Sequence, residues 1–214
     1  MNSCLIPQPK KDNCWQNKHI EYEKKSKSCD ADVVWIGDSI IERIQTSSLW
    51  KEKISKFKCV NYGIGGDRVE NVLWRVENGE LDFNCKIKVV VLHLGTNNIS
   101  QSVEEISEGI VNLVEIITKK LDDVTILFPT LLPKGQFPNR GRETNQKVNE
   151  LLTEIFSDSK YNGKVIIIPI HKNIIENNGT ISRKMLHDYL HLTDDAYNKV
   201  FLPVYAQLEL ILGT

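Results

Sequence analysis

Residues 33–40 read Val33-Val34-Trp35-Ile36-Gly37-Asp38-Ser39-Ile40, an apolar run followed at once by a glycine and two polar residues. Similar apolar runs recur along the chain at Cys59–Tyr62, Val89–Leu92, Val124–Leu127 and Val165–Ile168. Continuous apolar character, rather than alternation with polar residues, is typical of strands that are buried on both faces of a parallel sheet.

Helical patterns separate these runs. Apolar residues recur at helical period from Val103 to Leu121 and from Thr144 to Phe156. A third helical stretch extends from Asp194 to Leu212, where Pro203 predicts a kink or a break. Near the N-terminus, a further helix is indicated by the spacing of Trp15, His19 and Tyr22.

The alternation of strands and helices predicts an α/β fold. We expect a flavodoxin-like, doubly wound parallel sheet of about five strands with right-handed crossovers, in a three-layer α/β/α sandwich. The length of 214 residues fits one domain with a full core. We therefore expect a single domain over residues 1–214, with residues 1–30 as a helical leader packed on it.

Charge balance argues against a nucleic-acid-binding protein. The 27 Lys and Arg residues nearly cancel the 28 Asp and Glu residues, which leaves a formal charge of -1. Affinity for a phosphate backbone comes from concentrated basic residues. The local cluster Lys24-Lys25-Ser26-Lys27 is typical of a solvated surface.

Cysteine usage and hydropathy point to the cytoplasm. The 5 cysteines are scattered and form no C-x-x-C pair, which is typical of reduced thiols in a cytosolic protein. The first residues contain no apolar stretch long enough for a signal peptide. The longest apolar runs are too short to cross a bilayer, so no transmembrane segment is expected.

Ligands of such sheets bind beyond the carboxyl ends of the strands, which directs attention to the residues after each apolar run. Gly37 permits a tight turn, and Ser39 falls at the start of the next helix. There the serine hydroxyl can act as a nucleophile, while its own N–H and the helix dipole favour a developing oxyanion. An ordinary Asp/Ser helix cap is the alternative.

Two further loops follow strands. Gly63-Ile64-Gly65-Gly66-Asp67-Arg68 is not a dinucleotide fingerprint, because Arg68 stands where its third glycine belongs. The loop suits a second oxyanion donor or a tight turn without a ligand. In His93-Leu94-Gly95-Thr96-Asn97-Asn98, a side-chain amide is able to donate to an oxyanion, and a plain turn asparagine is the alternative.

The segment His187-Asp188-Tyr189-Leu190-His191 contains an acid three residues before a histidine. The carboxylate of Asp188 is able to accept from Nδ1–H of His191 and leave Nε2 free to take a proton from a serine. His187 and His191 also stand at the spacing by which a helix offers two imidazoles to zinc. No downstream histidine completes that ligand set, and we interpret His187, like His19, His93 and His171, as a structural residue.

The order of these elements along one α/β chain resembles the four sequence blocks of the SGNH (GDSL-type) hydrolases. Further stretches resemble the intracellular type Ib platelet-activating factor acetylhydrolase catalytic subunits. These stretches are residues 71–80, 131–135 and 189–193, together with the leader pattern Asp12-x-x-Trp15-x-x-x-His19. The likeness covers essentially the whole chain.

The resemblance implies an SGNH hydrolase fold and a set of site residues. Ser39 would be the nucleophile, His191 the general base and acid, and Asp188 the residue that orients the imidazole. The N–H groups of Ser39 and Gly66 and the side chain of Asn97 would form the oxyanion hole. A small acyl pocket that favours acetyl groups would be lined by Ile40, Thr96 and Leu190.

The resemblance also implies that neither a metal nor an organic cofactor is needed. It implies a dimer, as a homodimer or with a paralogous subunit, and association with a WD-repeat regulatory subunit. Three departures bear on the substrate rather than on the chemistry. Ile40 replaces the usual Leu, residues 68–70 are larger than in the animal subunits, and Asp194-Asp195 stands where some subunits have glycines.

A serine esterase that hydrolyses acetyl esters, with platelet-activating factor-like phospholipids among its candidate substrates, is the leading hypothesis. A carbohydrate O-acetyl esterase or a lysophospholipase of the same fold are alternatives, as is a non-catalytic scaffold that acts through its partners. A zinc hydrolase built on His187 and His191 is a further rival.

Overall fold

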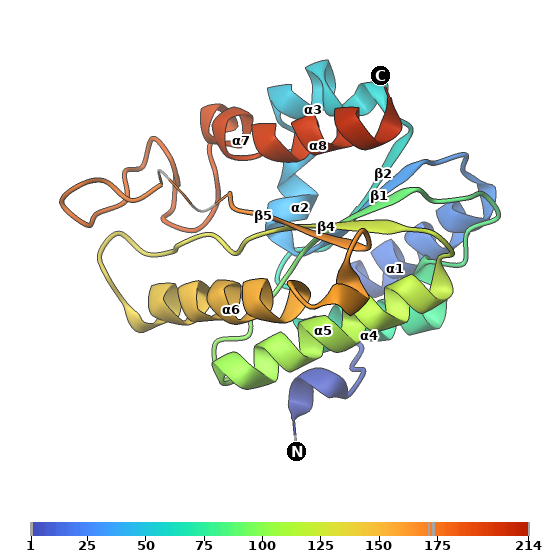
Figure 1. Ribbon diagram of the computed structural model, residues 1–214, viewed down its shortest axis with the longest axis horizontal. Coiled ribbons are helices and arrows are strands. Elements are labelled where there is room, and N and C mark those ends of the chain that lie inside the picture. The colour runs from blue at the N-terminus through green and yellow to red at the C-terminus, as the bar shows by residue number, and fades with distance from the viewer. Residues whose placement is uncertain (1, 171, 173, 214) are drawn as a thin grey trace.

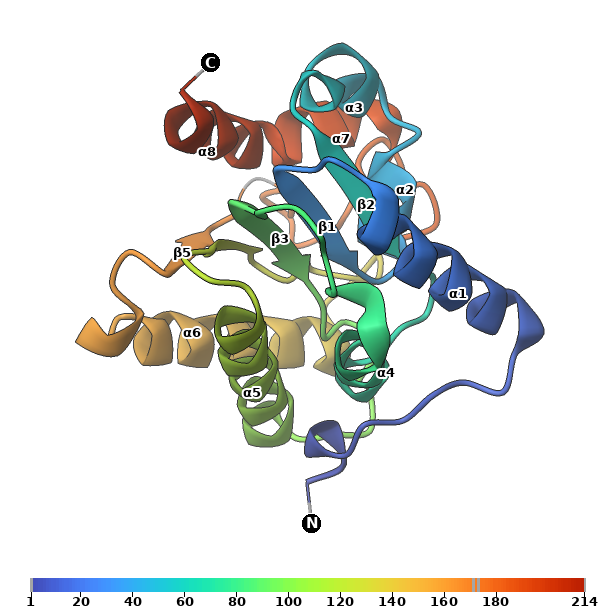
Figure 2. The same ribbon diagram turned by 90° about the vertical axis from the view of Figure 1, so that its right-hand side faces the viewer.

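The computed structural model describes residues 2–170, 172 and 174–213. Its centre is a sheet of five parallel strands in the order β2-β1-β3-β4-β5 (Figure 1 and Figure 2). The strands are β1 (Val33–Gly37), β2 (Cys59–Gly63), β3 (Val89–His93), β4 (Thr125–Pro129) and β5 (Val165–Ile168). The predicted parallel sheet of about five strands is confirmed.

Helices connect the strands and cover both faces of the sheet. The α-helices are α1 (Asn13–Ser28), α2 (Ser39–Ile44), α3 (Ser48–Glu52), α4 (Val69–Arg75), α5 (Val103–Lys120), α6 (Arg140–Phe156), α7 (Asp194–Val200) and α8 (Leu202–Leu212). Short helical turns are η1 (Ser3–Leu5), η2 (Ile54–Lys56), η3 (Val76–Glu80) and η4 (Ser159–Tyr161).

Alternate side chains of each strand enter two separate cores. In β1, Val34 and Ile36 pack with the apolar faces of α4, α5 and α6, whereas Val33 and Trp35 pack with α2, α3, α7 and α8. Because successive side chains of a strand point to opposite faces, one short apolar run supplies both cores. The result is the predicted three-layer sandwich, with α7 and α8 on one side of the sheet and α5 and α6 on the other (Figure 1).

Local sequence accounts for the ends of the helices. Ser102 and Glu105 form a capping box at the start of α5, and Asn139 accepts from the N–H of Arg142 at the start of α6. The predicted interruption near Pro203 is confirmed, because α7 ends before Phe201 and α8 begins with the proline in its first turn.

The N-terminal helix α1 packs beside the sheet and reaches the carboxyl end of β2. Asp12 caps α1 through the N–H groups of Cys14 and Trp15. The helix lies along the β2 side of the sheet (Figure 2), where the Tyr22 hydroxyl donates to the carbonyl of Gly63 at 3.1 Å. Within the described residues, no helix is both long and apolar enough to span a membrane.

Candidate active site

Ser39 lies where β1 turns into α2. Asp38 is the N-cap of α2, and its side chain accepts from the N–H of Ile40 at 2.9 Å. The turn requires glycine at position 37, because a Cβ there would lie 2.1 Å from the carbonyl oxygen of His93 on β3. The close approach of β1 and β3 therefore presents the half-buried Ser39 at the carboxyl edge of the sheet.

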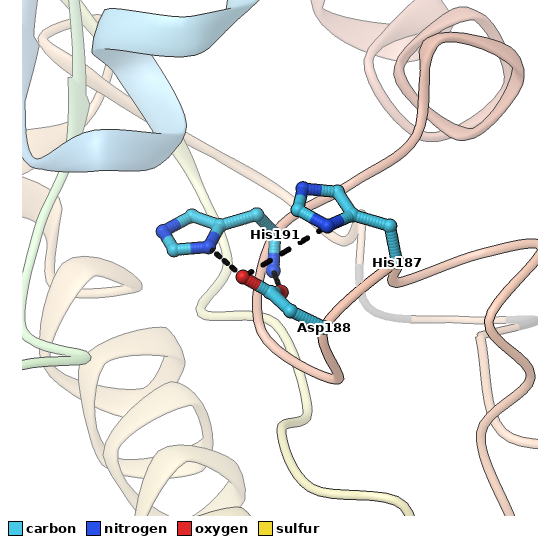
Figure 3. A group of neighbouring side chains, drawn as sticks. All are labelled: His187, Asp188 and His191. Atoms are coloured by element: carbon cyan, nitrogen blue, oxygen red, sulfur yellow. Dashed lines mark hydrogen bonds and ion pairs between the residues drawn. The ribbon is translucent and has the colours of Figure 1, made fainter.

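A hydrogen-bonded chain joins three of the predicted site residues. Ser39 Oγ lies 2.9 Å from His191 Nε2. On the other side of the ring, His191 Nδ1 lies 2.6 Å from Asp188 Oδ2 (Figure 3). Ser39 and His191 are 152 positions apart in the sequence. The fold thus brings together a hydroxyl, an imidazole and a carboxylate in the order that proton transfer from a serine requires.

The acid and the histidine come from an irregular turn, not from a helix. Tyr189, between them, has a φ of 64°, and an antiparallel bridge between Leu186 and Leu192 closes the turn. Asp188 Oδ1 accepts from the N–H groups of Leu190 at 3.0 Å and His191 at 2.7 Å. Burial alone would raise the pKa of Asp188. The hydrogen bonds from the His191 ring and from these backbone groups outweigh burial and hold that pKa well below its usual range.

The glycine-rich loop after β2 lies beside the serine. A Cβ on Gly65 would be 3.9 Å from Ser39 Cβ, and Gly66 has a φ of +74°, a conformation that favours glycine. Asn97 Nδ2 donates to the carbonyl of Asp67 at 2.9 Å. The loop that carries Gly66 and the turn that carries Asn97 are therefore joined directly.

The two asparagines after β3 have different surroundings. Asn98 is buried, and its amide accepts from the N–H of Val69 and donates to Glu70. Asn97 is half-buried and keeps one amide hydrogen beyond its bond to Asp67. The structure thus distinguishes the asparagine that holds α4 from the one that is available to a ligand.

The predicted acyl-pocket residues differ in their placement. Ile40 is buried in the core formed with α7 and α8, and Leu190 is half-buried. Thr96 is buried, and its hydroxyl accepts from Asn145 at 3.1 Å. Thr96 also lines a cavity of about 530 Å³ between the starts of α5 and α6, and neither Ile40 nor Leu190 is among the residues that line it.

The sequence profile of the GDSL-like lipase/acylhydrolase family matches residues 35–199. The chain belongs to this family.

Two related proteins are similar in sequence to this chain over most of its length. The platelet-activating factor acetylhydrolase IB subunit beta homolog of Drosophila melanogaster is 38% identical, over 100% of this chain and 95% of its own length. The platelet-activating factor acetylhydrolase IB subunit alpha2 of Rattus norvegicus is 36% identical, over 94% of this chain and 85% of its own length. The acylhydrolase is accordingly a carboxylic ester hydrolase.

A solved structure supports the fold independently. The crystal structure of a GDSL-like lipase from Bacteroides thetaiotaomicron superimposes with a TM-score of 0.64 and 18% identity, over 92% of this chain and 96% of the other. The SGNH hydrolase fold that the sequence blocks implied is confirmed.

Two charged side chains near the site of the acylhydrolase were not assigned from its sequence. Asp38 is fully buried, and burial raises its pKa to about 7. Lys134 Nζ donates to the carbonyl of Thr96 at 2.7 Å, and burial lowers the pKa of this lysine. A charged residue after a strand is only a weak indication of a role at the site. The sequence does not reveal that the Asp38 carboxyl is shielded from water; the three-dimensional structure does.

The histidine pair does not have the helical geometry that the zinc hypothesis assumed. His187 is exposed, its Nε2 faces the Arg43 guanidinium at 3.4 Å, and its ring stacks on that of His191. The donor atoms of His187, Asp188 and His191 lie within 4.8 Å of one another. The shared carboxylate oxygen, however, is bonded to His191 at 2.6 Å and stands 3.9 Å from His187 (Figure 3). A metal would have to break the link that orients His191.

His93 and His19 have the structural surroundings expected for them. His93 is fully buried with Nδ1 at 3.0 Å from the carbonyl oxygen of Pro129, and burial lowers its pKa to about 4. His19 is buried against Glu80. His171 lies outside the described residues.

Proposed function

We propose that this acylhydrolase cleaves acetyl and other short-chain esters through an acyl-enzyme formed on Ser39. The observation that carries the proposal is the continuous chain from Ser39 Oγ through the His191 ring to Asp188, at 2.9 and 2.6 Å. These distances lie within the range for a nucleophile and a base that exchange a proton.

The first half of the reaction acylates the serine. Ser39 Oγ attacks the ester carbonyl carbon while its proton passes to His191 Nε2, and Asp188 stabilises the imidazolium. When the tetrahedral intermediate collapses, the bond to the alcohol oxygen breaks and His191 returns the proton to that oxygen. In the second half, water attacks the acyl-enzyme and its proton passes to His191 Nε2. The bond between the acyl carbon and Ser39 Oγ then breaks, His191 gives the proton to Ser39 Oγ, and the carboxylic acid leaves.

The developing oxyanion would be held by the N–H groups of Ser39 and Gly66 and by the amide of Asn97. In favour of this assignment, Gly65 lies beside Ser39, and Asn97 is tied to the residue that follows Gly66. Removal of one such donor in other hydrolases costs about 2.7–4 kcal/mol of transition-state stabilisation.

The proposed preference for short acyl groups follows the resemblance, which assigns Ile40, Thr96 and Leu190 to the acyl pocket. Ile40 and Thr96 are both buried, and the Thr96 hydroxyl is already bonded to Asn145. Together with Leu190 they would leave room for an acetyl group but not for a long chain. The named activity of both relatives, acetylhydrolysis of platelet-activating factor, makes such phospholipids the first candidate substrates.

We extend the proposal to assembly and location. Both relatives are named as subunits, which favours a homodimer or a dimer with a paralogous chain. The cytoplasm is the location that we propose, because the 5 cysteines are scattered and form no C-x-x-C pair. A WD-repeat regulatory subunit is the further partner that we propose. Sedimentation velocity of the purified chain, alone and with a candidate partner, tests these assemblies.

Substrate preference is tested by initial rates on p-nitrophenyl acetate, butyrate and octanoate beside platelet-activating factor and an acetylated sugar. We expect a steep fall from acetyl to octanoyl. Activity on the phospholipid but not on the sugar would identify phospholipid esters as the substrate class. A flat chain-length profile would contradict the pocket, and hydrolysis of the sugar alone would replace the phospholipid by a carbohydrate ester.

A further inference from the structure

A fully buried charge cluster lies directly behind the glycine-rich loop. Asp67, Arg75 and Glu80 each have no exposed surface. Arg75 donates to Asp67 Oδ2 at 2.7 Å and to both oxygens of Glu80, at 2.8 and 2.7 Å. Buried charges persist only where they are paired and hydrogen-bonded, so this cluster has one well-defined geometry.

The N-terminal leader completes the cluster from outside the sheet. Trp15 Nε1 donates to Asp67 Oδ1 at 2.7 Å, and Lys10 Nζ lies 2.9 Å from the same oxygen. His19 Nδ1 lies 2.9 Å from Glu80 Oε1. Two carboxylates thus face the cations of Arg75 and Lys10, and both oxygens of Asp67 are occupied.

Asp67 is the buried anchor of the exposed segment 65–68 of this loop. Gly65, Gly66 and Arg68 are exposed, whereas Asp67 between them is fully buried. Its backbone carbonyl accepts from Asn97 at 2.9 Å. The position of the Asp67 side chain therefore fixes the Gly66 N–H through the backbone and the Asn97 amide through this hydrogen bond.

We propose that Trp15 and Lys10 are positioning residues for ester hydrolysis, because they hold Asp67 and thereby aim the Gly66 N–H and the Asn97 amide at the oxyanion. This inference rests on the proposed function above. Oxyanion donors stabilise a transition state only when they are held in place beforehand, and small displacements remove much of the effect. The leader is thus part of the catalytic apparatus without touching the substrate.

Trp15→Phe is the variant that isolates this role. Phenylalanine keeps a ring beside Trp74 and His19 but removes the N–H that bonds Asp67. We expect kcat for p-nitrophenyl acetate to fall on the order of tenfold with KM unchanged, less than the loss of a whole donor. Trp74→Phe is the matched control, since Trp74 belongs to the same aromatic group and its described contacts do not include Asp67. It should leave kcat unchanged.

A double variant with Asn97→Ala distinguishes a positioning role of Trp15 from a general loss of stability. In an Asn97→Ala background, Trp15→Phe should lower kcat by a clearly smaller factor, because part of what it positions is already absent. An equal loss in both backgrounds, or a wild-type kcat in Trp15→Phe, would overturn the proposal. Should Trp15→Phe fail to fold, Lys10→Met at the half-buried rim of the cluster provides the same comparison.

Amide hydrogen exchange gives a readout that does not depend on activity. In Trp15→Phe we expect faster exchange at residues 65–68 and unchanged exchange in β3. Unchanged exchange at 65–68 overturns the proposal even if the wild type is active. An inactive wild type overturns the proposed function instead, and exchange at 65–68 then decides by itself whether the leader holds the loop.

Discussion

The two carboxylate oxygens of Asp188 have separate partners, one the His191 ring and the other two backbone N–H groups. This division fixes the orientation of the carboxylate without any helix around it. It also determines the tautomer of His191, because Nδ1 must carry the proton that Asp188 accepts.

Asp188→Asn should therefore abolish most of the activity. The amide oxygen would take the two backbone bonds, so the amide nitrogen would face Nδ1 and leave the proton on Nε2. We expect kcat for p-nitrophenyl acetate to fall by about 10³–10⁴-fold with folding intact. His187→Gln is the control, because His187 lies next to Asp188 but outside the chain to Ser39, and it should keep near wild-type kcat. Equal losses in the two variants would contradict this account.

Asp38 makes a second residue-scale prediction, on stability rather than on rate. Its ordinary pKa is 3.8, and burial raises it to about 7 in the folded state. Between these values the folded state binds more protons than the unfolded state, so the Asp38 contribution to stability falls as pH rises. Asp38→Asn keeps the acceptor for the N–H of Ile40 and removes the ionisation.

Urea unfolding at about pH 5 and about pH 8 measures this effect. The wild type should lose more stability than Asp38→Asn over this interval. Parallel pH profiles for the two proteins would show that Asp38 does not carry the change.

At the scale of elements, the apolar pattern predicts most strands and the longer helices. Strands buried on both faces appear as continuous apolar runs, and helices with one buried face appear as apolar residues at helical period. Cys59, Val89 and Val165 begin strands as expected, and β4 begins one residue later than predicted. Helix α6 begins at Arg140, ahead of the predicted Thr144, because a polar cap and not an apolar stripe defines its first turn.

Helix α4 was not predicted because its surroundings are unusual. Six of its seven residues are buried, among them Glu70 and Arg75, so it has no polar face to produce helical periodicity. Its charges are neutralised by residues outside the helix, because Arg75 pairs with Asp67 in the loop before α4 and with Glu80 at the end of η3. Single-sequence patterns do not encode such pairings.

The packing of α2 on β2 gives an element-scale prediction. A Cβ on Gly63 would lie 2.1 Å from the backbone nitrogen of Glu42, which no side-chain rotation relieves. Gly63→Ala should lower the free energy of unfolding by about 3 kcal/mol or more. Gly65→Ala is the control, because the one close contact of its Cβ is the flexible end of the Glu42 side chain at 2.9 Å, and Ser39 Cβ stands at an ordinary 3.9 Å. Equal unfolding free energies for the two variants would contradict this interpretation of the α2–β2 contact.

At the scale of the whole molecule, the site depends on how the C-terminal segment is docked. The side chain of Asp194 accepts from both the N–H and the hydroxyl of Ser48, and the Tyr197 hydroxyl donates to the carbonyl of Ile40 at 2.9 Å. These bonds tie α7 to α3 and to the first turn of α2. The turn that carries His191 is thereby brought over Ser39.

The sequence predicted which strand ends carry polar groups but not how these groups meet. Placement of Ser39, the glycine-rich loop and Asn97 at one sheet edge follows from parallel strands. The approach of His191 does not, because its turn is irregular and lies 152 positions from Ser39. Only the resemblance of the sequence blocks suggested that pairing in advance, and the leader's contact with Asp67 had no sequence signal of its own.

Ester hydrolysis through Ser39 is tested most directly by stoichiometric labelling with a fluorophosphonate, followed by peptide mass spectrometry. An activated serine reacts covalently with this reagent, whereas an ordinary helix-cap serine does not. We predict one adduct per folded chain, on the peptide that contains Ser39, and no adduct in Ser39→Ala. A folded wild type that remains unlabelled, or an adduct on another residue that persists in Ser39→Ala, would contradict the account.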